Sequence, residues 1–238
     1  MKKNVAFTIF MAFMAIPFIC AQDLDRILEN HFDAIGQENL LEIKTIKATG
    51  KALNMGMEMP FTMMNKRPNM IRIVVEFQGS QVIQATDGET VWMVNPMMGS
   101  AEPVEITGEQ GGGLIESADM DGQLWNYKQK GHQLELDGTE EVDGEETYVL
   151  KLNKDSGNTD YYYLDKDNYR VVKVRSTAIM NGSEVETETF LSNYQDVEGY
   201  MMPFVTEQRF DGQPANRIMI EEVTFNEKMD DDIFSMPD

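Results

Sequence analysis

Histidine and cysteine are rare in this chain, and its 41 acidic residues are so abundant that no pair stands out as an acid and a base. The 238-residue chain has two histidines, His31 and His132, and one cysteine, Cys20. Neither histidine is accompanied by a catalytic cysteine or a G-x-S-x-G serine, and the sequence has no H-E-x-x-H, Walker A or dinucleotide-binding motif. Three aspartates at 230–232 lack the alternating spacing of a calcium-binding loop and are typical of a solvated acidic segment. We therefore expect no catalytic residue, no metal and no cofactor, and we do not expect an enzyme.

A glycine triplet at 111–113 raises the possibility of phosphate binding. A P-loop has a lysine and a serine or threonine directly after its glycines, whereas Leu114 and Ile115 follow here. The triplet is therefore predicted to be a hinge or a plain loop. It lies in the segment 102–131, which lacks strand-like alternation, and its apolar residues predict one or two short helices over 110–127.

The N-terminus has the pattern of an export signal. Two lysines precede an apolar run from Val5 to Cys20, which is short for a membrane span. Cys20 could be a lipidation site, but Ile19 is bulky where lipoprotein signals have a small residue. Ala21 offers a small residue at a cleavage site instead. We predict a signal peptide over 1–21 that is cut after Ala21, with a lipid anchor at Cys20 as the alternative.

The mature chain would be one acidic domain of 238 − 21 = 217 residues. Removing two lysines with the signal changes the net charge from −21 to −23, which disfavours nucleic acid and anionic membrane surfaces as partners. The only cysteine leaves with the signal, so no disulfide is expected. A chain of this length can bury enough apolar surface to fold without one.

Periodicity predicts one helix followed by a long run of strands. Leu24, Ile27, Leu28, Phe32 and Ile35 are spaced as on a helix, and Gly36 follows as a C-terminal cap. Pairs of an acid or Asn with Gly then predict turns between strands, at 87–88, 137–138, 143–144, 181–182 and 211–212. The expected strands cover 43–53, 57–65, 70–78, 80–86, 89–95, 133–142, 145–153, 159–165, 170–180, 184–195, 200–210 and 216–225.

These elements predict an α+β fold that is mainly β. We expect a single, strongly curved antiparallel sheet of about a dozen strands, with the helix at 24–35 and the segment 110–127 in its concave face.

Nineteen methionines are a large number for a sheet protein. In a strand over 57–65, one face carries apolar residues at every second position, namely Met57, Met59, Phe61 and Met63. The next strand carries a second such row, namely Ile71, Ile73, Val75 and Phe77. Three interpretations stay open: an ordinary sheet core, a cavity whose flexible thioethers adapt to an apolar ligand, or a Cu(I) site formed by Met55, Met57 and Met59.

Two motifs resemble a known family. "KRPNM" at 66–70 and "DGETVWMVNP" at 87–96 are similar to motifs of the LolA-type periplasmic lipoprotein carriers. The match is sharp over 62–98 and looser elsewhere, and the C-terminal third departs from it. The resemblance implies an incomplete antiparallel β-barrel with helices as a lid over an apolar cavity. It also implies a monomer in the periplasm that ferries acylated lipoproteins or other lipids from an inner-membrane donor complex to an outer-membrane acceptor.

The resemblance also assigns roles to residues. Arg67 would hold backbone carbonyls of the 110–127 segment and keep the lid closed, whereas Arg72, outside the motif, is expected to matter little. The cavity would be lined by Met57, Met59, Phe61, Met63, Ile71, Ile73, Val75, Phe77, Trp92, Leu114 and Ile115. A ligand-sensing or interaction module of the same fold is the alternative function, and a Cu(I)-binding protein is a third.

Overall fold

The computed structural model describes residues 16–54, 56–98, 100–107, 109–180, 183–210 and 212–237. Most of the expected signal peptide and the predicted turn at 181–182 lie outside these residues, as does Met55. The first described element, α1, begins at Ile16, so the expected cut after Ala21 falls inside it. Within the described part of the chain, no helix has both the length and the hydropathy needed to cross a bilayer.

Thirteen strands form one antiparallel sheet, in the order β6-β5-β4-β3-β2-β1-β13-β12-β11-β10-β9-β8-β7. Consecutive strands pair as hairpins, and the pairing of β1 with β13 joins the two halves of the sheet. The strands are β1 (Thr45–Asn54), β2 (Met57–Lys66), β3 (Met70–Phe77), β4 (Ser80–Thr86), β5 (Val91–Asn95), β6 (Ser100–Glu105), β7 (Gln133–Val142), β8 (Glu145–Asn153), β9 (Thr159–Asp165), β10 (Val171–Met180), β11 (Ser183–Val197), β12 (Tyr200–Phe210) and β13 (Gln213–Phe225).

The sheet is strongly curved but not closed, because β6 and β7 remain at opposite edges. This confirms the prediction of a single curved antiparallel sheet that forms an incomplete barrel. Strand β6 was not predicted, and Asp137 and Gly138 do not form a hairpin turn. They lie inside β7, where the register shifts at a bulge and Gly138 has a φ of 132°.

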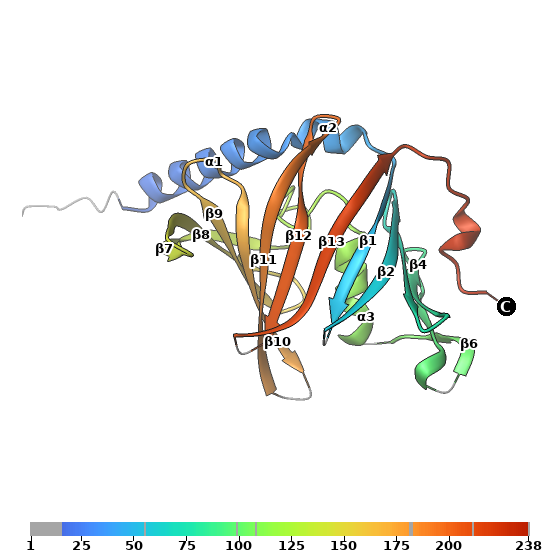
Figure 1. The fold of residues 1–238 in the computed structure, drawn as a ribbon. Coiled ribbons are helices and arrows are strands. Elements are labelled where there is room, and N and C mark those ends of the chain that lie inside the picture. The colour runs from blue at the N-terminus through green and yellow to red at the C-terminus, as the bar shows by residue number, and fades with distance from the viewer. Residues whose placement is uncertain are drawn as a thin grey trace, which may run out of the picture.

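The α-helices lie against one face and one end of the sheet. The α-helices are α1 (Ile16–Ile35), α2 (Gln37–Glu42) and α3 (Glu109–Ala118), and two short 3-10 helices are η1 (Pro96–Met98) and η2 (Asp231–Ile233). Figure 1 shows α1 and α2 crossing one end of the sheet and α3 inside its curve, behind β13 and β1. Gly36 ends α1 as predicted, with a φ of 69°. A Cβ atom there would lie 2.0 Å from the carbonyl oxygen of Gly199, so only glycine fits.

We call the face that carries α1 and α3 the inner face and the opposite one the outer face. On α1, the leucine and isoleucine side chains that were predicted to be apolar pack against β8 to β10, in a cluster formed by Leu24, Ile27, Leu28, Leu124, Leu150, Leu164 and Val171. Each such side chain contributes roughly 1.5–3 kcal/mol when fully buried. A smaller cluster around Leu40 and Met120 joins α2 to β1.

The glycine triplet is helical rather than a hinge. Gly111, Gly112 and Gly113 lie within α3. At Gly111, an added Cβ would lie 3.4 Å from the side chain of Val91 and 3.3 Å from the carbonyl oxygen of Ile106. The absence of a side chain therefore lets α3 approach β5 closely.

Candidate functional site: the inner face and its lid

The floor of the inner face is apolar and lined with small residues along its middle. Directly paired residues of antiparallel strands point to the same face. Met63 pairs with Ile73 on one side and with Ala48 on the other, and Phe61 pairs with Val75 and Gly50. The long side chains of β2 and β3 therefore lie beside the small ones of β1, where Ala48 and Ala52 are buried.

Ten of the eleven predicted cavity residues belong to this face or to the helix that covers it. The rows on β2 and β3 are brought together by the strand pairing, and Leu114 and Ile115 lie on α3. Burial changes along the rows. Ile71, near α3, is 1% exposed and Phe61 is 7% exposed, whereas Met57 at the far end of β2 is 45% exposed. The inner face is thus sealed at one end and open at the other.

Trp92 does not lie on the inner face, contrary to the prediction that it lines the cavity. It pairs with Ala85, which pairs with Arg72, and that row lies on the outer face, whereas the neighbouring Val91 faces α3. Trp92 is only 1% exposed because the C-terminal segment 229–237 covers it, and its indole Nε1 donates a hydrogen bond of 2.7 Å to the carbonyl oxygen of Phe234. It is a residue of the outer-face core and not a ligand contact.

The C-terminal segment 229–237 is fastened to the outer face by the motif that resembles the carriers. Lys66 donates a 2.6 Å hydrogen bond to the carbonyl oxygen of Met229 and forms an ion pair with Asp231. Arg72 donates a 2.7 Å hydrogen bond to the carbonyl oxygen of Ile233 and lies over the ring of Trp92. Arg72 therefore holds this segment in place, and its small effect on the lid stays a prediction.

Arg67 holds the lid, although by other partners than predicted. Its Nε donates a 2.7 Å hydrogen bond to the carbonyl oxygen of Ile43, and its Nη2 donates one of 2.9 Å to that of Leu40. Both carbonyls lie at the end of α2 and not in the 110–127 segment. Arg67 reaches that segment through the carboxylate of Asp121, with Nη1 2.6 Å from Oδ1 as an ion pair outside hydrogen-bonding geometry.

Further side-chain bonds close the same end of the sheet. Gln37 of α2 donates to the carbonyl oxygen of Asp121 at 3.1 Å, and Asn39 donates to that of Gly199 at 2.8 Å. We call α2 and the loop 119–123 the lid. Besides these hydrogen bonds, Leu40 and Met120 of the lid pack in a buried apolar cluster with Ile46 of β1.

Helix α3 bridges the two halves of the curved sheet. On one side, Asn65 of β2 donates a hydrogen bond of 3.1 Å to the carbonyl oxygen of Ser117. On the other side, the ammonium of Lys154 lies 2.9 Å from Glu116 of α3 and 3.0 Å from Asp160 of β9. Burial lowers the pKa of Lys154, but the bonds to Glu116 and Asp160 outweigh it and raise this pKa overall. The ammonium therefore stays charged and fixes α3 across the concave side.

Beneath the lid lies a cavity of about 120 Å³. Its lining comes from α1, α2, the loop 120–125 and strands β9, β10 and β12, and consists of His31, Phe32, Ile35, Gln37, Leu40, Met120, Asp121, Gly122, Gln123, Leu124, Trp125, Tyr162, Val171 and Tyr200. Pockets for small molecules usually measure about 300–1,000 Å³. The closed lid therefore leaves too little room for an acyl chain at this end of the inner face.

His31 connects α1 to the sheet at the edge of this cavity. It is 6% exposed, and its Nδ1 donates a 2.8 Å hydrogen bond to the carbonyl oxygen of Tyr169. Burial lowers the pKa of His31 below its usual value of 6.5, and the bond to Tyr169 only partly opposes this. The imidazole is therefore neutral and structural. His132 lies elsewhere, bonded to Gln123 and to the backbone N–H of Asp155.

Comparison with solved structures identifies the fold. A domain described as an outer membrane lipoprotein-sorting protein from Vibrio parahaemolyticus superposes with a TM-score of 0.59 at 13% identity, covering 87% of this chain and 97% of that one. A DUF1329 family protein from Desulfovibrio piger gives a TM-score of 0.60 at 13% identity, covering 88% and 97%. A LolA superfamily protein from Nitrosomonas europaea gives 0.59 at 16% identity, covering 91% and 97%.

The chain therefore has a LolA-like fold, as the two motifs indicated. At these identities the similarity is one of fold. No protein-family model and no curated protein sequence matches the chain.

Replacing Arg67 should open the lid. In Arg67→Leu the carbonyls of Leu40 and Ile43 lose their donor, at a cost of about 1–3 kcal/mol, which shifts a lid equilibrium roughly tenfold or more. We expect the purified variant to bind a fluorescent apolar probe more strongly than the parent protein. Arg26→Leu is the control, because Arg26 is exposed on α1 and pairs only with Asp23. Equal probe binding by the two variants would contradict the gating role.

Removing the anchor of the C-terminal segment should destabilise the sheet. Phe234 is fully buried, so Phe234→Ala should lower the free energy of unfolding by about 3–5 kcal/mol. Urea denaturation followed by Trp fluorescence measures this. Met236→Ala, at a residue that is 36% exposed in the same segment, should change stability by less than about 1 kcal/mol. Similar losses in both variants would mean that the segment is not held by Phe234.

Acidification should weaken the attachment of α1. The folded protein binds a proton on His31 less readily than the unfolded chain does. The contribution of neutral His31 to the free energy of unfolding is therefore fully present above pH 6.5. It is lost as the pH falls through the lowered folded pKa. The loss is at most about 1.4 kcal/mol per pH unit. In His31→Asn the amide can replace the bond to Tyr169 without titrating. We expect urea denaturation at pH 7.5 and pH 5 to show a smaller acid loss in this variant, whereas equal losses would contradict the assignment.

Proposed function

We propose that the protein is a non-enzymatic periplasmic carrier that binds acyl chains of lipoproteins, or other lipids, on its inner face. The observation that carries this proposal is the apolar row on the inner face of β2 and β3, which is buried at Ile71 beside α3 and exposed at Met57 at the far end of β2. An acyl chain could enter at Met57 and displace the lid as it advances toward Ile71. Donor and acceptor proteins at the two membranes would load and unload it.

The inner face can supply the binding energy without specific polar contacts. Burying one methylene is worth about 0.8 kcal/mol, so ten buried methylenes give roughly 8 kcal/mol. That gross value corresponds to about micromolar affinity before ordering costs are subtracted. The free energy needed to open the lid lowers the net binding free energy further. A carrier has to release its cargo, so moderate affinity suits this function.

The methionines fit the same proposal. Met57, Met59 and Met63 are unbranched and partly exposed on the inner face, so they can repack around chains of different shape. Met57 and Met59 lie two residues apart on this face. Closely spaced thioethers can bind Cu(I), so a Cu(I) site is a second, weaker candidate. A ligand-sensing or interaction module of the same fold, which passes no cargo on, is the remaining candidate.

Native mass spectrometry of protein purified from the periplasm tests the proposal. We expect a mass increment from lipid or from acylated protein. A copper increment, or a stoichiometric protein partner without lipid, would contradict it in favour of one of the other two candidates.

A matched pair of variants places the lipid on one face. Met63 and Met64 are neighbours on β2, both half-buried, but Met63 faces inward and Met64 pairs with Arg72 on the outer face. Glutamine is close to methionine in length and polar. We expect Met63→Gln to lower the fraction of lipid-bound protein several-fold and Met64→Gln to leave it unchanged, with thermal unfolding as a check on folding. The reverse order, or equal losses, would exclude the inner face.

A further inference from the structure

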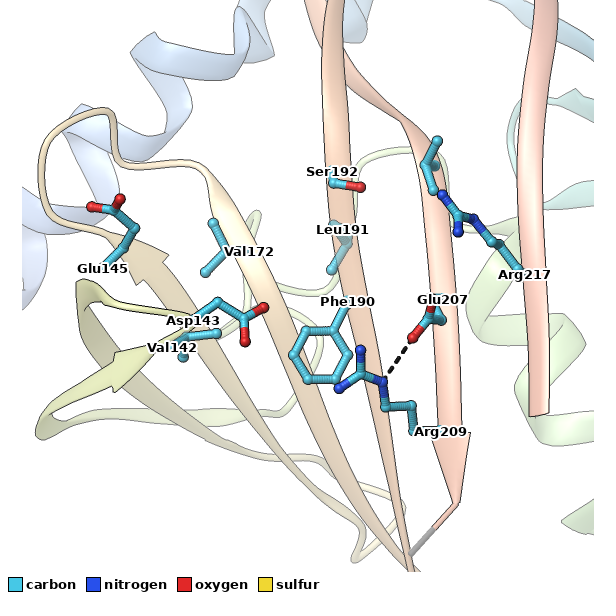
Figure 2. Close-up of a pocket in the computed structure, with 11 residues that line it drawn as sticks. Val142, Asp143, Glu145, Val172, Phe190, Leu191, Ser192, Glu207, Arg209 and Arg217 are labelled. Carbon is cyan, nitrogen blue, oxygen red and sulfur yellow. Dashed lines mark hydrogen bonds and ion pairs between the residues drawn. The ribbon is translucent and has the colours of Figure 1, made fainter. Parts of the chain in front are cut away.

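A separate pocket lies on the outer face, away from the lid. It has a volume of about 310 Å³, which is in the usual range of small-molecule sites. The hairpin between β7 and β8 forms one wall, and strands β10 to β13 form the floor and the other wall (Figure 2). The lining residues are Val142, Asp143, Glu145, Val172, Phe190, Leu191, Ser192, Val205, Glu207, Arg209 and Arg217.

The strand pairing places the pocket floor on the outer face. Phe190 pairs with Lys173, and Lys173 pairs with Tyr163. The neighbours of Tyr163 along β9, Tyr162 and Leu164, pack in the cluster around α1 on the inner face. A ligand in this pocket would therefore be separated from a lipid on the inner face by the thickness of the sheet.

One wall carries two guanidinium groups. Arg209 donates from Nε to Glu207 Oε1 at 2.7 Å, and its guanidinium carbon lies 4.1 Å from the centre of the Phe190 ring. These contacts fix the group and leave its terminal nitrogens to bind an anion. Arg217 lies opposite Glu207 on β13, and its side chain forms no hydrogen bond or ion pair with the described residues. Figure 2 shows its guanidinium on the far side of Glu207 from Arg209.

The other wall carries two carboxylates. Asp143 and Glu145 flank Gly144 in the turn of the β7–β8 hairpin, and neither side chain is paired within the described part of the chain. Figure 2 shows Asp143 pointing across the pocket toward Phe190 and Arg209. The two walls do not form an ion pair with each other, so the pocket holds opposite charges on either side of an aromatic ring.

We propose that this pocket binds a small zwitterion. Its anionic oxyacid group would lie on Arg209, and its ammonium would lie on Asp143. The short carbon linker between the two charges would lie against Phe190, whose ring face also attracts the cation. A simple anion fits poorly because it would meet the carboxylates of Asp143, Glu145 and Glu207. Phosphoethanolamine has the required chemistry, either as the headgroup of a phospholipid or as a free compound.

Titration calorimetry with O-phosphoethanolamine tests the site directly, with phosphate and ethanolamine as separate controls. We expect the zwitterion to bind at least about tenfold more tightly than either half, because only the zwitterion engages both walls. Asp143→Asn keeps a residue that tolerates the φ of 51° at this turn, and it should weaken binding about tenfold. Arg209→Gln should weaken binding by a similar factor.

Arg175→Gln is the matched control. Arg175 lies on the same face and stacks on Tyr161 at 4.2 Å, but it does not line the pocket. This variant should bind O-phosphoethanolamine like the parent protein. No binding by the parent, equal binding of phosphate alone, or the same affinity in Asp143→Asn would each overturn the proposal, whatever becomes of the lipid on the inner face.

Vesicles distinguish the two sources of the ligand. If the pocket recognises a membrane headgroup, the protein should sediment with vesicles that contain phosphatidylethanolamine more than with pure phosphatidylcholine, whose ammonium cannot donate hydrogen bonds. Asp143→Asn should abolish the difference. Binding of the free zwitterion without any vesicle preference assigns the pocket to a soluble ligand of the same chemistry. A vesicle preference that survives in Asp143→Asn overturns the membrane assignment.

Discussion

The guanidinium of Arg67 connects segments that are far apart in the sequence. It bonds the last carbonyls of α2, pairs with Asp121 in the loop after α3, and sits where β2 turns into β3. The closed end of the inner face depends on this group, because both parts of the lid meet there. A flexible ammonium could not satisfy two carbonyls and a carboxylate in this fixed arrangement as well as a planar guanidinium does. Further along the inner face, α3 is held by Asn65 on one side and by Lys154 on the other.

The neighbouring residues of the motif use the opposite face. Lys66 and Arg72 hold the C-terminal segment on the outer side, and Trp92 packs beneath it. The stretch of sequence that resembles the lipoprotein carriers therefore fastens the lid on one side and the end of the chain on the other.

Much of the fold could be predicted from the sequence because its signals are local. Alternation and Asx-Gly turns located twelve of the thirteen strands, and the helical spacing from Leu24 to Ile35 located most of α1. Strand β6 is short and contains Pro103, so it has little of either signal. Helix α2 has only six residues and therefore too few for a periodic pattern. The glycines of α3 were misread because their reason, the approach to Val91, is a tertiary contact.

The candidate site could be predicted only in part. The rows on β2 and β3 were placed correctly because one face of each strand is clearly more apolar. In β5 both Val91 and Trp92 are buried, so alternation gives no indication of which faces inward. Arg67 is held by Leu40, Ile43 and Asp121, which are distant from it in the sequence. Every residue has a backbone carbonyl, so the sequence does not indicate which carbonyls accept its hydrogen bonds. The outer pocket joins strands from the second half of the chain, and no local motif marks it.

The central claim, that an acyl chain lies on the inner face, is tested most directly by the methionine methyl groups. In protein labelled with 13C at the methionine methyls, a fatty acid with a nitroxide on its chain broadens the NMR signals of methyls that lie close to it. The account predicts stronger broadening of Met57, Met59 and Met63 on the inner face than of Met64 and Met219 on the outer face. Stronger broadening of Met64 and Met219, or equal broadening on both faces, would contradict it.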